Sequence, residues 1–407
     1  RLLPASVMAL LQLATLATLA FAAVRSPRSM RALPVMSGGG ESAVAAAPVP
    51  ATAPPATAAF GAFEWKQHWY PVAWARDCVL DVPMKVTIFD EDYCVVLRGS
   101  GRTPIALRDK CPHRSAALSE GRVTEQGLVQ CSYHGWAFDG EDGECKSIPQ
   151  LLDPAAAMLD PAAAIARLPF VPPAKSCADA VAIQVVDGMV WMHTQAKTAA
   201  EAPFPIPRIP EMSDPRYKVL PAVRDFPVDH SLLVENICDP DHGLFAHRAL
   251  GFDLYAASAA HPLTVAVEGA AAMPVFRSSV EAVPKLTAKP DSGKAKRAKG
   301  GEPAGPLHAS TRFDAPCMVH MGRRDAGGNS SFLTAFWVLP VGVGRSRFLS
   351  AAISTAPVLP PRWVQSVVLN NFLDEDTYLL ATQQPKVLGA ELDAHTAAAT
   401  AAAAAAG

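Results

Sequence analysis

Two short motifs, each pairing a cysteine with a histidine, carry the clearest chemistry in this sequence. Cys111-Pro-His113 and Cys131-Ser-Tyr-His134 supply two thiolates and two imidazoles, and 17 residues lie between His113 and Cys131. Two cysteines on one iron and two histidines on the other hold a [2Fe–2S] cluster of high potential, which passes single electrons. The pattern therefore predicts such a cluster on Cys111, His113, Cys131 and His134, and an acceptor for its electrons.

A structural zinc site is the alternative for the same four side chains. Two cysteines and two histidines also bind Zn²⁺ in tetrahedral geometry. Zinc motifs, however, usually keep the cysteines together in one short pair and the histidines in another. Here each segment contributes one of each, which favours a cluster held from two sides.

A second set of metal-type residues lies in a segment expected to be helical, residues 229–250. It contains Asn236, Asp239, His242 and His247. Two neutral imidazoles and one carboxylate form the facial triad of non-haem Fe(II) oxygenases, which leaves positions open for O₂. Two histidines alone on a helix are usually surface or core residues. Beside an electron-donating cluster, His242 and His247 instead predict a mononuclear iron site.

The carboxylate ligand of that iron must come from elsewhere in the chain. A helix is expected over residues 360–384, with Pro360 and Pro361 at its start, and it contains Asp374-Glu375-Asp376. We expect Asp376 to bind the iron, with Asp374 as the alternative. The plain interpretation of the triplet is a solvated helix face.

Short β-type runs separated by turns are expected to position the cluster segments, and they predict an all-β domain over residues 63–195. Asp187-Gly188 between the last two runs predicts a hairpin. The proline-rich residues 195–215 predict an extended connection, and residues 216–385 a mixed second domain, so that the fold class is α+β. The runs are residues 84–89, 94–98, 105–108, 181–186 and 189–193 in the first domain, and 262–282 and 311–352 in the second.

Net charge and local composition narrow the range of binding partners and mark two segments outside the predicted domains' cores. The 407 residues carry a formal net charge of −2, which gives no case for nucleic acid. Residues 285–300, with six Lys or Arg and one acid, predict a mobile surface loop. Residues 386–407 form a low-complexity, alanine-rich tail.

Residues 1–60 are interpreted as a targeting region followed by an Ala/Pro-rich linker. The apolar residues 7–24 fit a signal-peptide core better than a membrane helix, and residues 21–40 carry three arginines and no acid, which is typical of a transit peptide. A signal followed by a transit peptide resembles the two-part targeting to plastids of secondary endosymbiotic origin. An ordinary secretory signal with a disordered pro-region is the alternative.

Several stretches between about Phe63 and Gln384 resemble the Rieske non-haem iron oxygenases. Within them, the match is to the plastid group of pheophorbide a oxygenase, protochlorophyllide a oxygenase, chlorophyllide a oxygenase and the Rieske component of the inner-envelope translocon. The stretches are residues 65–72 (WKQHWYPV), 109–114 (DKCPHR), 118–123 (LSEGRV), 130–136 (QCSYHGW), 235–242 (ENICDPDH) and 339–347 (LPVGVGRSR).

The resemblance implies a Rieske β domain followed by a helix-grip catalytic domain, an antiparallel sheet curled around a long helix. It also implies a homotrimer in which the cluster of one subunit faces the mononuclear iron of its neighbour. Asp239 would bridge a cluster histidine, His113 or His134, to an iron histidine. Asn236 would lie near the iron without being a strong ligand.

The same resemblance implies an activity. Reduced ferredoxin would supply electrons, and the iron would use O₂ to oxygenate pheophorbide a, chlorophyllide a or protochlorophyllide a in an apolar pocket of a plastid enzyme at the envelope or thylakoid membrane. A redox component of the protein translocon and a sterol-type Rieske desaturase are the alternatives. Four aromatic residues are candidates for the pocket, with a plain core role as the expected alternative: Phe313, Phe332, Phe336 and Trp337.

Overall fold

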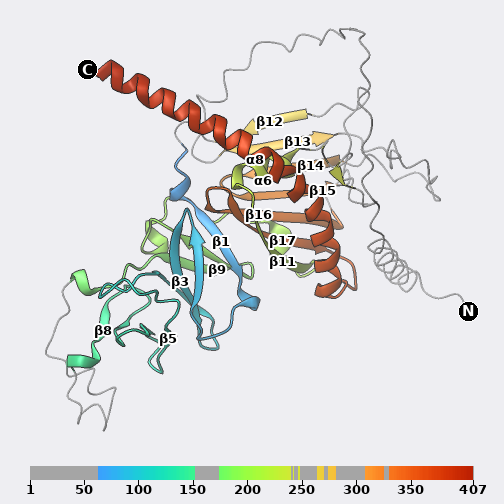
Figure 1. The fold of residues 1–407 in the computed structure, drawn as a ribbon. Helices are drawn as coiled ribbons and strands as arrows, with labels where there is room; N and C mark the ends of the chain where they lie inside the picture. The colour runs from blue at the N-terminus through green and yellow to red at the C-terminus, as the bar shows by residue number, and fades with distance from the viewer. Residues whose placement is uncertain are drawn as a thin grey trace, which may run out of the picture. The chain divides into compact units, whose positions relative to one another are not determined.

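The computed structural model describes most of the chain after the first 62 residues (Figure 1). These are residues 63–151, 174–239, 242, 246–247, 264–269, 274–280, 308–324 and 330–406. They belong to one compact unit, residues 60–407. The predictions for residues 1–60 and 285–300 lie outside the described residues.

The first half of the described chain folds into three small antiparallel sheets. Their strands bury β-branched and aromatic side chains, as in β3, where Tyr93, Val95 and Val96 are at most 1% exposed. The first sheet has the order β1 (Trp69–Trp74), β10 (Met189–His193), β9 (Ala182–Val186); the second β2 (Met84–Ile88), β3 (Glu91–Arg98), β4 (Thr103–Arg108); the third β5 (Arg122–Val123), β6 (Val129–Gln130), β7 (Ala137–Phe138), β8 (Cys145–Ser147).

The predicted hairpin at Asp187-Gly188 is confirmed. Strands β9 and β10 pair with Val186 opposite Met189, so that only two residues form the turn. Asp187 and Gly188 both have positive φ, 51° and 77°. Such a turn matches the right-handed twist of its strands, which is why Asp-Gly favours it.

Short 3₁₀ turns flank the strands of this half. They are η1 (Trp65–Gln67), η2 (Ala75–Asp77), η3 (Pro149–Leu151), η4 (Ala174–Ser176) and η5 (Ala199–Glu201). The proline-rich connection that follows the last β run contains one short helix, α5 (Pro210–Ser213).

A seven-stranded antiparallel sheet dominates the second half. The long strands β16 and β17 pair from Phe332 opposite Ser354 to Gly342 opposite Arg345. Its order is β11 (Lys218–Phe226), β17 (Arg345–Ser354), β16 (Phe332–Gly342), β15 (Met318–Arg324), β14 (His308–Asp314), β13 (Val275–Val280), β12 (Thr264–Glu268).

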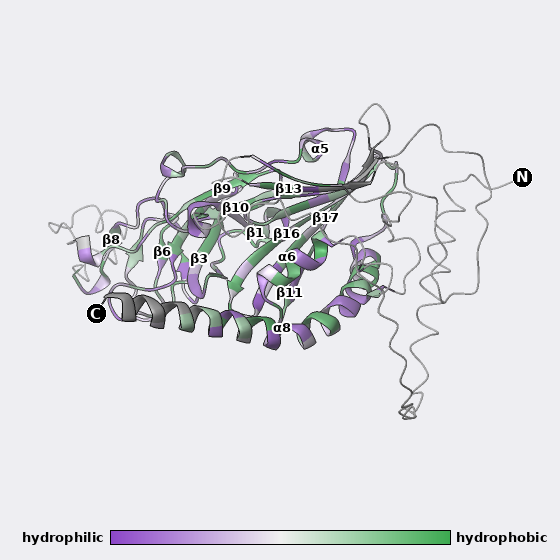
Figure 2. Cartoon of the chain, turned by 90° about the horizontal axis from the view of Figure 1, so that it is seen from above, coloured by the Kyte–Doolittle hydropathy of each residue, from purple (hydrophilic) through white to green (hydrophobic). Residues whose placement is uncertain are grey.

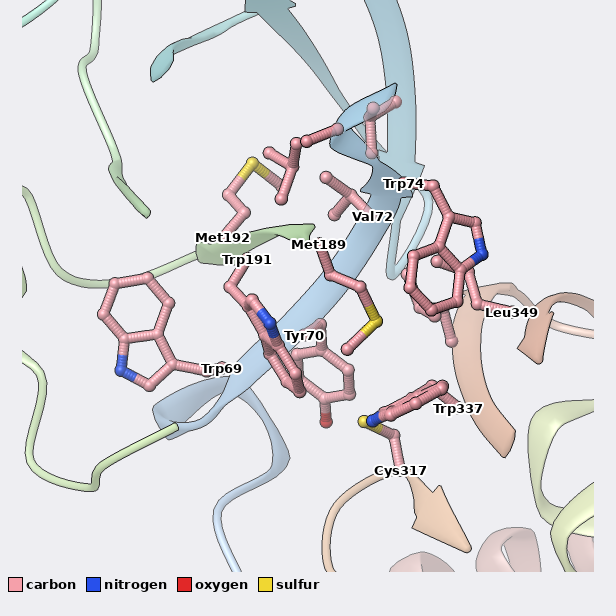
Figure 3. Packing of buried hydrophobic residues seen from close by; sticks show 14 of the residues in the cluster. Trp69, Tyr70, Val72, Trp74, Met189, Trp191, Met192, Cys317, Trp337 and Leu349 are labelled. Carbon is pink, nitrogen blue, oxygen red and sulfur yellow. The ribbon is translucent and has the colours of Figure 1, made fainter. Parts of the chain in front are cut away.

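The two faces of this sheet bury different sets of side chains, because neighbouring residues of a strand point to opposite faces. On one face Trp337 is 1% exposed and packs edge-on against Trp74, with ring centroids 5.9 Å apart (Figure 3). On the other face Phe336 stacks on Phe348. The core role is thus confirmed for Trp337, which faces away from Phe336, whereas Phe332 is 48% exposed.

Two helices, α6 (His230–Cys238) and α8 (Arg362–Ala406), pack on the Phe336 face of the sheet (Figure 2). Leu233 of α6 and Leu373 and Leu380 of α8 share a core with that face. The helix expected over residues 360–384 runs on through Pro385, because the alanines that follow are the strongest helix formers.

The α+β fold class is confirmed by this combination of β sheets with a long helix against a large sheet. In the described part of the chain, no helix combines the length and the apolar character needed to cross a lipid bilayer.

Candidate metal centres

The two cysteine–histidine segments form loops with the same backbone bonds. The N–H of Cys111 donates to the carbonyl of Ala116 (2.8 Å), and the N–H of Cys131 donates to the carbonyl of Trp136 (2.9 Å). Four residues after each cysteine, a second N–H donates back to the cysteine carbonyl, at 2.8 and 3.0 Å. Each loop is therefore closed on itself and presents one cysteine and one histidine.

The four side chains of these loops converge. Cys111 and Cys131 are each 2% exposed, and their thiols are in hydrogen-bonding contact. The rings of His113 and His134 lie 4.6 Å apart at 65°, and His113 stacks on Trp136 at 4.7 Å. Burial raises the pKa of the Cys111 thiol, and the neighbouring Cys131 adds to the rise.

A short segment between the two loops connects them. Both the N–H and the hydroxyl of Ser119 donate to the carboxylate of Asp109, at 2.7 and 2.6 Å, just before the first loop. In the second loop the hydroxyl of Ser132 donates to the carbonyl of Glu120 (2.6 Å). Through these hydrogen bonds, the adjacent residues Ser119 and Glu120 connect the two loops.

The second centre joins residues that are far apart in the sequence. One ligand-type atom from each of His242, His247 and Asp376 lies within 4.8 Å of the other two. Oδ1 of Asp376 is 3.3 Å from Nε2 of His247 and 3.7 Å from Nε2 of His242. His247 is 3% exposed and Asp376 4%. Two imidazoles and one carboxylate at this spacing are able to bind one cation.

Hydrogen bonds and ring packing orient these three side chains. Nδ1 of His242 lies 2.7 Å from the carbonyl oxygen of Asp239, so that Nδ1 is the protonated nitrogen and Nε2 is left for a metal. The ring of Phe372 stacks on His247 at 3.6 Å. Burial raises the pKa of Asp376 to about 6, although His242 and a hydrogen bond from Asn236 lower it.

The structure separates the two candidate carboxylates. Asp374 forms an ion pair with Arg224 and its side chain is 64% exposed. Asp376, two residues later on α8, points instead toward His242 and His247. Of the two, only Asp376 is placed where it could share a metal with the histidines.

Two known protein families match segments that contain residues of the two centres. The Rieske [2Fe–2S] domain matches residues 68–158, and the pheophorbide a oxygenase family matches residues 313–391. The chain carries a Rieske domain followed by a pheophorbide a oxygenase-type domain. The first match contains both cysteine–histidine loops, and the second contains Asp376.

Individual relatives agree with these two domains. The chloroplastic pheophorbide a oxygenase of Oryza sativa subsp. japonica is 38% identical over 200 residues, which are 48% of this chain and 36% of the relative. Protein TIC 55, chloroplastic, of Arabidopsis thaliana is 28% identical over 332 residues, 79% of this chain and 54% of the relative. The chain thus spans about half the length of these curated relatives, or less.

A solved structure shares the fold. Dicamba monooxygenase bound to 3,6-dichlorosalicylic acid superimposes with a TM-score of 0.59 at 18% sequence identity, over 82% of this chain and 92% of that one. The likeness extends over both the Rieske domain and the sheet-and-helix domain.

The side chains present fit the cofactors that these matches imply. A Rieske domain implies a [2Fe–2S] cluster. Besides the two buried thiols, Nδ1 of His113 is buried without a hydrogen-bond partner among the described residues, as expected for a nitrogen that faces a metal. Oδ1 of Asp376 is likewise buried without a hydrogen-bond partner among the described residues, which fits an iron at the second centre.

Two residues that contact the centres were assigned no role from the sequence. Trp136 lies within the second loop motif, but its stacking on His113 depends on how the two loops meet. Phe372 stacks on His247 and lies four residues before Asp376 on α8. Because residues four apart share a helix face, that spacing was a usable signal.

Proposed function

We propose that this chain is a Rieske non-haem iron oxygenase that takes electrons from reduced ferredoxin and uses O₂ to oxygenate a chlorophyll-type tetrapyrrole in a plastid. The observation that carries the proposal is the convergence of His242, His247 and Asp376 in a chain that also has a Rieske domain. An electron carrier and an O₂-binding iron site together form one oxygenase. The rice relative, a chloroplastic pheophorbide a oxygenase, supports the substrate class and the plastid.

In this proposal residues 63–195 are the electron-donating domain and residues 216–385 the catalytic domain. When bound, the cluster supplies single electrons and the mononuclear iron activates O₂. The cluster ligands are Cys111, His113, Cys131 and His134, and the iron ligands are His242, His247 and Asp376.

The residues around the proposed iron ligands hold them in position. The carbonyl of Asp239 fixes the tautomer of His242, and the amide of Asn236 orients the Asp376 carboxylate. Phe372 closes one face of the His247 ring and keeps water from it. Phe336, on the same face of the sheet as α6 and α8, is a candidate for the apolar wall of the substrate pocket.

The proposed assembly is a homotrimer in which the Asp239 side chain bridges an iron histidine to His113 or His134 of a neighbouring subunit. The proposed location is the envelope or thylakoid membrane, reached through a signal-plus-transit presequence. The chloroplastic relatives support the organelle.

Iron counting combined with a single turnover tests the proposal. We expect about three iron atoms per chain, two in the cluster and one at the triad. After anaerobic reduction, addition of O₂ with pheophorbide a, chlorophyllide a or protochlorophyllide a should give one oxygenated product, identified by mass. The His242→Ala variant should keep the Rieske spectrum and make no product. Oxygenation by that variant would contradict the iron assignment.

A redox component of the plastid protein translocon is the second candidate. The observation in its favour is that the match to protein TIC 55 extends over 79% of this chain. This function would need only the cluster. Two iron atoms per chain, with no product from any of the three tetrapyrroles, would favour it over the oxygenase.

A further inference from the structure

The turn between β16 and β17, residues 342–345, contacts the Rieske domain on one side. The N–H of Asp90, in the turn between β2 and β3, donates to the carbonyl of Val341 (2.8 Å). The carboxylate of Asp90 pairs with Arg345 (3.0 Å). A Cβ at Gly342 would lie 2.0 Å from Oδ1 of Asp90, so that a larger residue there would force the Asp90 side chain to shift. The turn is therefore connected to the Rieske domain by a backbone hydrogen bond and an ion pair.

On its other side the same turn contacts the start of α6. The N–H of Gly344 donates to Oδ2 of Asp229 (3.0 Å). Oδ1 of Asp229 caps α6 by accepting from the N–H of Ser231 (3.0 Å). The N–H of Asp229 donates to Oε1 of Gln384 on α8, and Nε2 of Gln384 donates to the carbonyl of Pro227 (3.4 Å).

These contacts join α8, which carries Asp376, to α6, which precedes the two histidines in the chain. The helix that Asp229 caps continues to Asn236 and leads to His242, whereas Gln384 lies eight residues after Asp376 on α8, about 12 Å along the helix axis. Metal sites require ligand positions within about 0.5 Å. A bond between the two elements thus limits how far the histidines can move from Asp376.

We propose that Asp229 and Gln384 are positioning residues of the iron site, which form a clasp between α6 and α8 that is anchored on the turn at Gly344. The inference rests on the proposed iron site and adds residues that do not contact the metal.

The charge state of Asp229 supports the clasp. Burial raises the pKa of its carboxyl, but the hydrogen bonds from Gly344 and Ser231 outweigh that effect and lower the pKa overall. Asp229 is therefore a carboxylate at neutral pH. Hydrogen bonds to a charged acceptor are about twice as strong as neutral ones, which suits a bond that must hold the start of α6 against the turn at Gly344.

A simpler role for Asp229 is to cap α6 and do nothing else. Asp229→Ser separates the two roles, because serine is an equally good N-cap but lacks the second oxygen that accepts from Gly344. Asp229→Ala removes both functions. If Asp229 only caps the helix, Asp229→Ser should bind Fe(II) like the unaltered chain. If the clasp is right, Asp229→Ser should bind Fe(II) as Asp229→Ala does.

The experiment measures Fe(II) binding at the triad of the full chain, by competition with a chelator, and the electron paramagnetic resonance spectrum of the Fe(II)–nitric oxide adduct. For Asp229→Ser and Gln384→Met we expect Fe(II) binding about 10- to 100-fold weaker and a broadened adduct spectrum, with the Rieske absorption unchanged. Asp214→Ser is the matched control, since Asp214 also accepts from the N–H two residues later but lies in an exposed turn.

The clasp is wrong if Asp229→Ser and Gln384→Met bind Fe(II) as tightly as Asp214→Ser and give the same adduct spectrum. His242→Ala is measured alongside and should lose the iron. If that variant keeps its iron, the iron site of the proposed function is wrong, and this outcome is distinct from a failure of the clasp alone.

Discussion

The cluster loops and the proposed iron triad are built in opposite ways. All four cluster-type side chains come from residues 111–134, on two loops that close with their own backbone bonds. The triad takes two histidines from the segment after α6 and one carboxylate from α8, so that His247 and Asp376 are 129 positions apart. The first centre depends on local chain geometry and the second on tertiary packing. Substitutions should therefore affect the two centres independently.

The largest effect is expected at the cluster itself. Cys111→Ser or Cys131→Ser removes a thiolate ligand, so that the iron content should fall from about three atoms per chain to about one. Iron analysis and the visible absorption spectrum measure this. Cys78→Ser, which alters a half-buried cysteine outside the loops, should change neither. A Cys111→Ser variant with an intact Rieske spectrum would refute the ligand assignment.

The next effect distinguishes the two acids of α8. Asp376→Ala should weaken Fe(II) binding by more than about 100-fold and leave the cluster spectrum intact, since a direct ligand matters at least as much as its hydrogen-bonding partner. Asp374→Ala breaks only an exposed ion pair with Arg224, worth about 0–1 kcal/mol. Chelator competition measures both variants, and equal losses of affinity would show that α8 is placed differently.

A smaller effect tests the spacing of the two cluster loops. A Cβ at Gly121 would lie 2.3 Å from the carbonyl oxygen of Gln130, next to the second loop. Gly121→Ala should therefore lower the free energy of unfolding by about 1–3 kcal/mol and reduce cluster occupancy.

Gly389→Ala on α8 is the control for that substitution, because nothing lies within 4 Å of the added methyl group. It should raise the stability by about 0.5–1 kcal/mol. Urea denaturation measures both variants, and the prediction fails if they shift the midpoint in the same direction.

The smallest effect concerns the core outside both centres. His68 is buried and stacks with Phe63 and Phe204, and burial, with a contribution from His193, lowers its pKa from 6.5 to about 4. Because the unfolded chain binds this proton more tightly, His68 contributes full stability above pH 6.5 and loses it as the pH falls toward 4. We expect a loss on the order of 1–3 kcal/mol.

Urea denaturation between pH 7.5 and pH 4.5, with the His68→Gln variant alongside, measures this dependence. The variant should show a shallower decline, since it lacks the titrating ring. An identical pH profile for both proteins would assign the acid sensitivity to other groups, among them the metal centres.

Features governed by short-range rules were predictable from the sequence. The Asp187-Gly188 hairpin follows from the need for positive φ at both turn positions. The cluster motifs were recognisable because each loop contains both its ligands and the residues that close it.

The carboxylate of the triad was partly predictable. Asp376 was favoured over Asp374, but the reason appears only when α8 is placed against the sheet. Leu373 and Leu380 bury their side chains in the core beneath α8, and Asp376 shares their side of the helix, whereas Asp374 is rotated by about 200° from it. The spacing of Leu373 and Leu380 around Asp376 was the sequence signal that this acid lies on the buried side of the helix.

Features that depend on contacts across the fold were not predictable. The clasp between Asp229 and Gln384 joins residues 155 positions apart, and nothing local marks Gln384. The face of Trp337 depends on the register of β16 with β15 and β17. Helix α8 continues past Pro385, where local rules end a helix, because a favourable alanine-rich sequence follows.

The long separation between His247 and Asp376 also bears on the order in which the protein matures. A chain made from its N-terminus completes both cluster loops by Trp136, whereas α8 is among the last described parts to be synthesised. A nascent chain could receive its iron–sulfur cluster early, but the two histidines of the proposed iron site would lack their carboxylate until α8 has packed against the sheet. In the proposed function, iron would therefore enter the triad only after α8 has packed against the sheet, later than the cluster enters its loops.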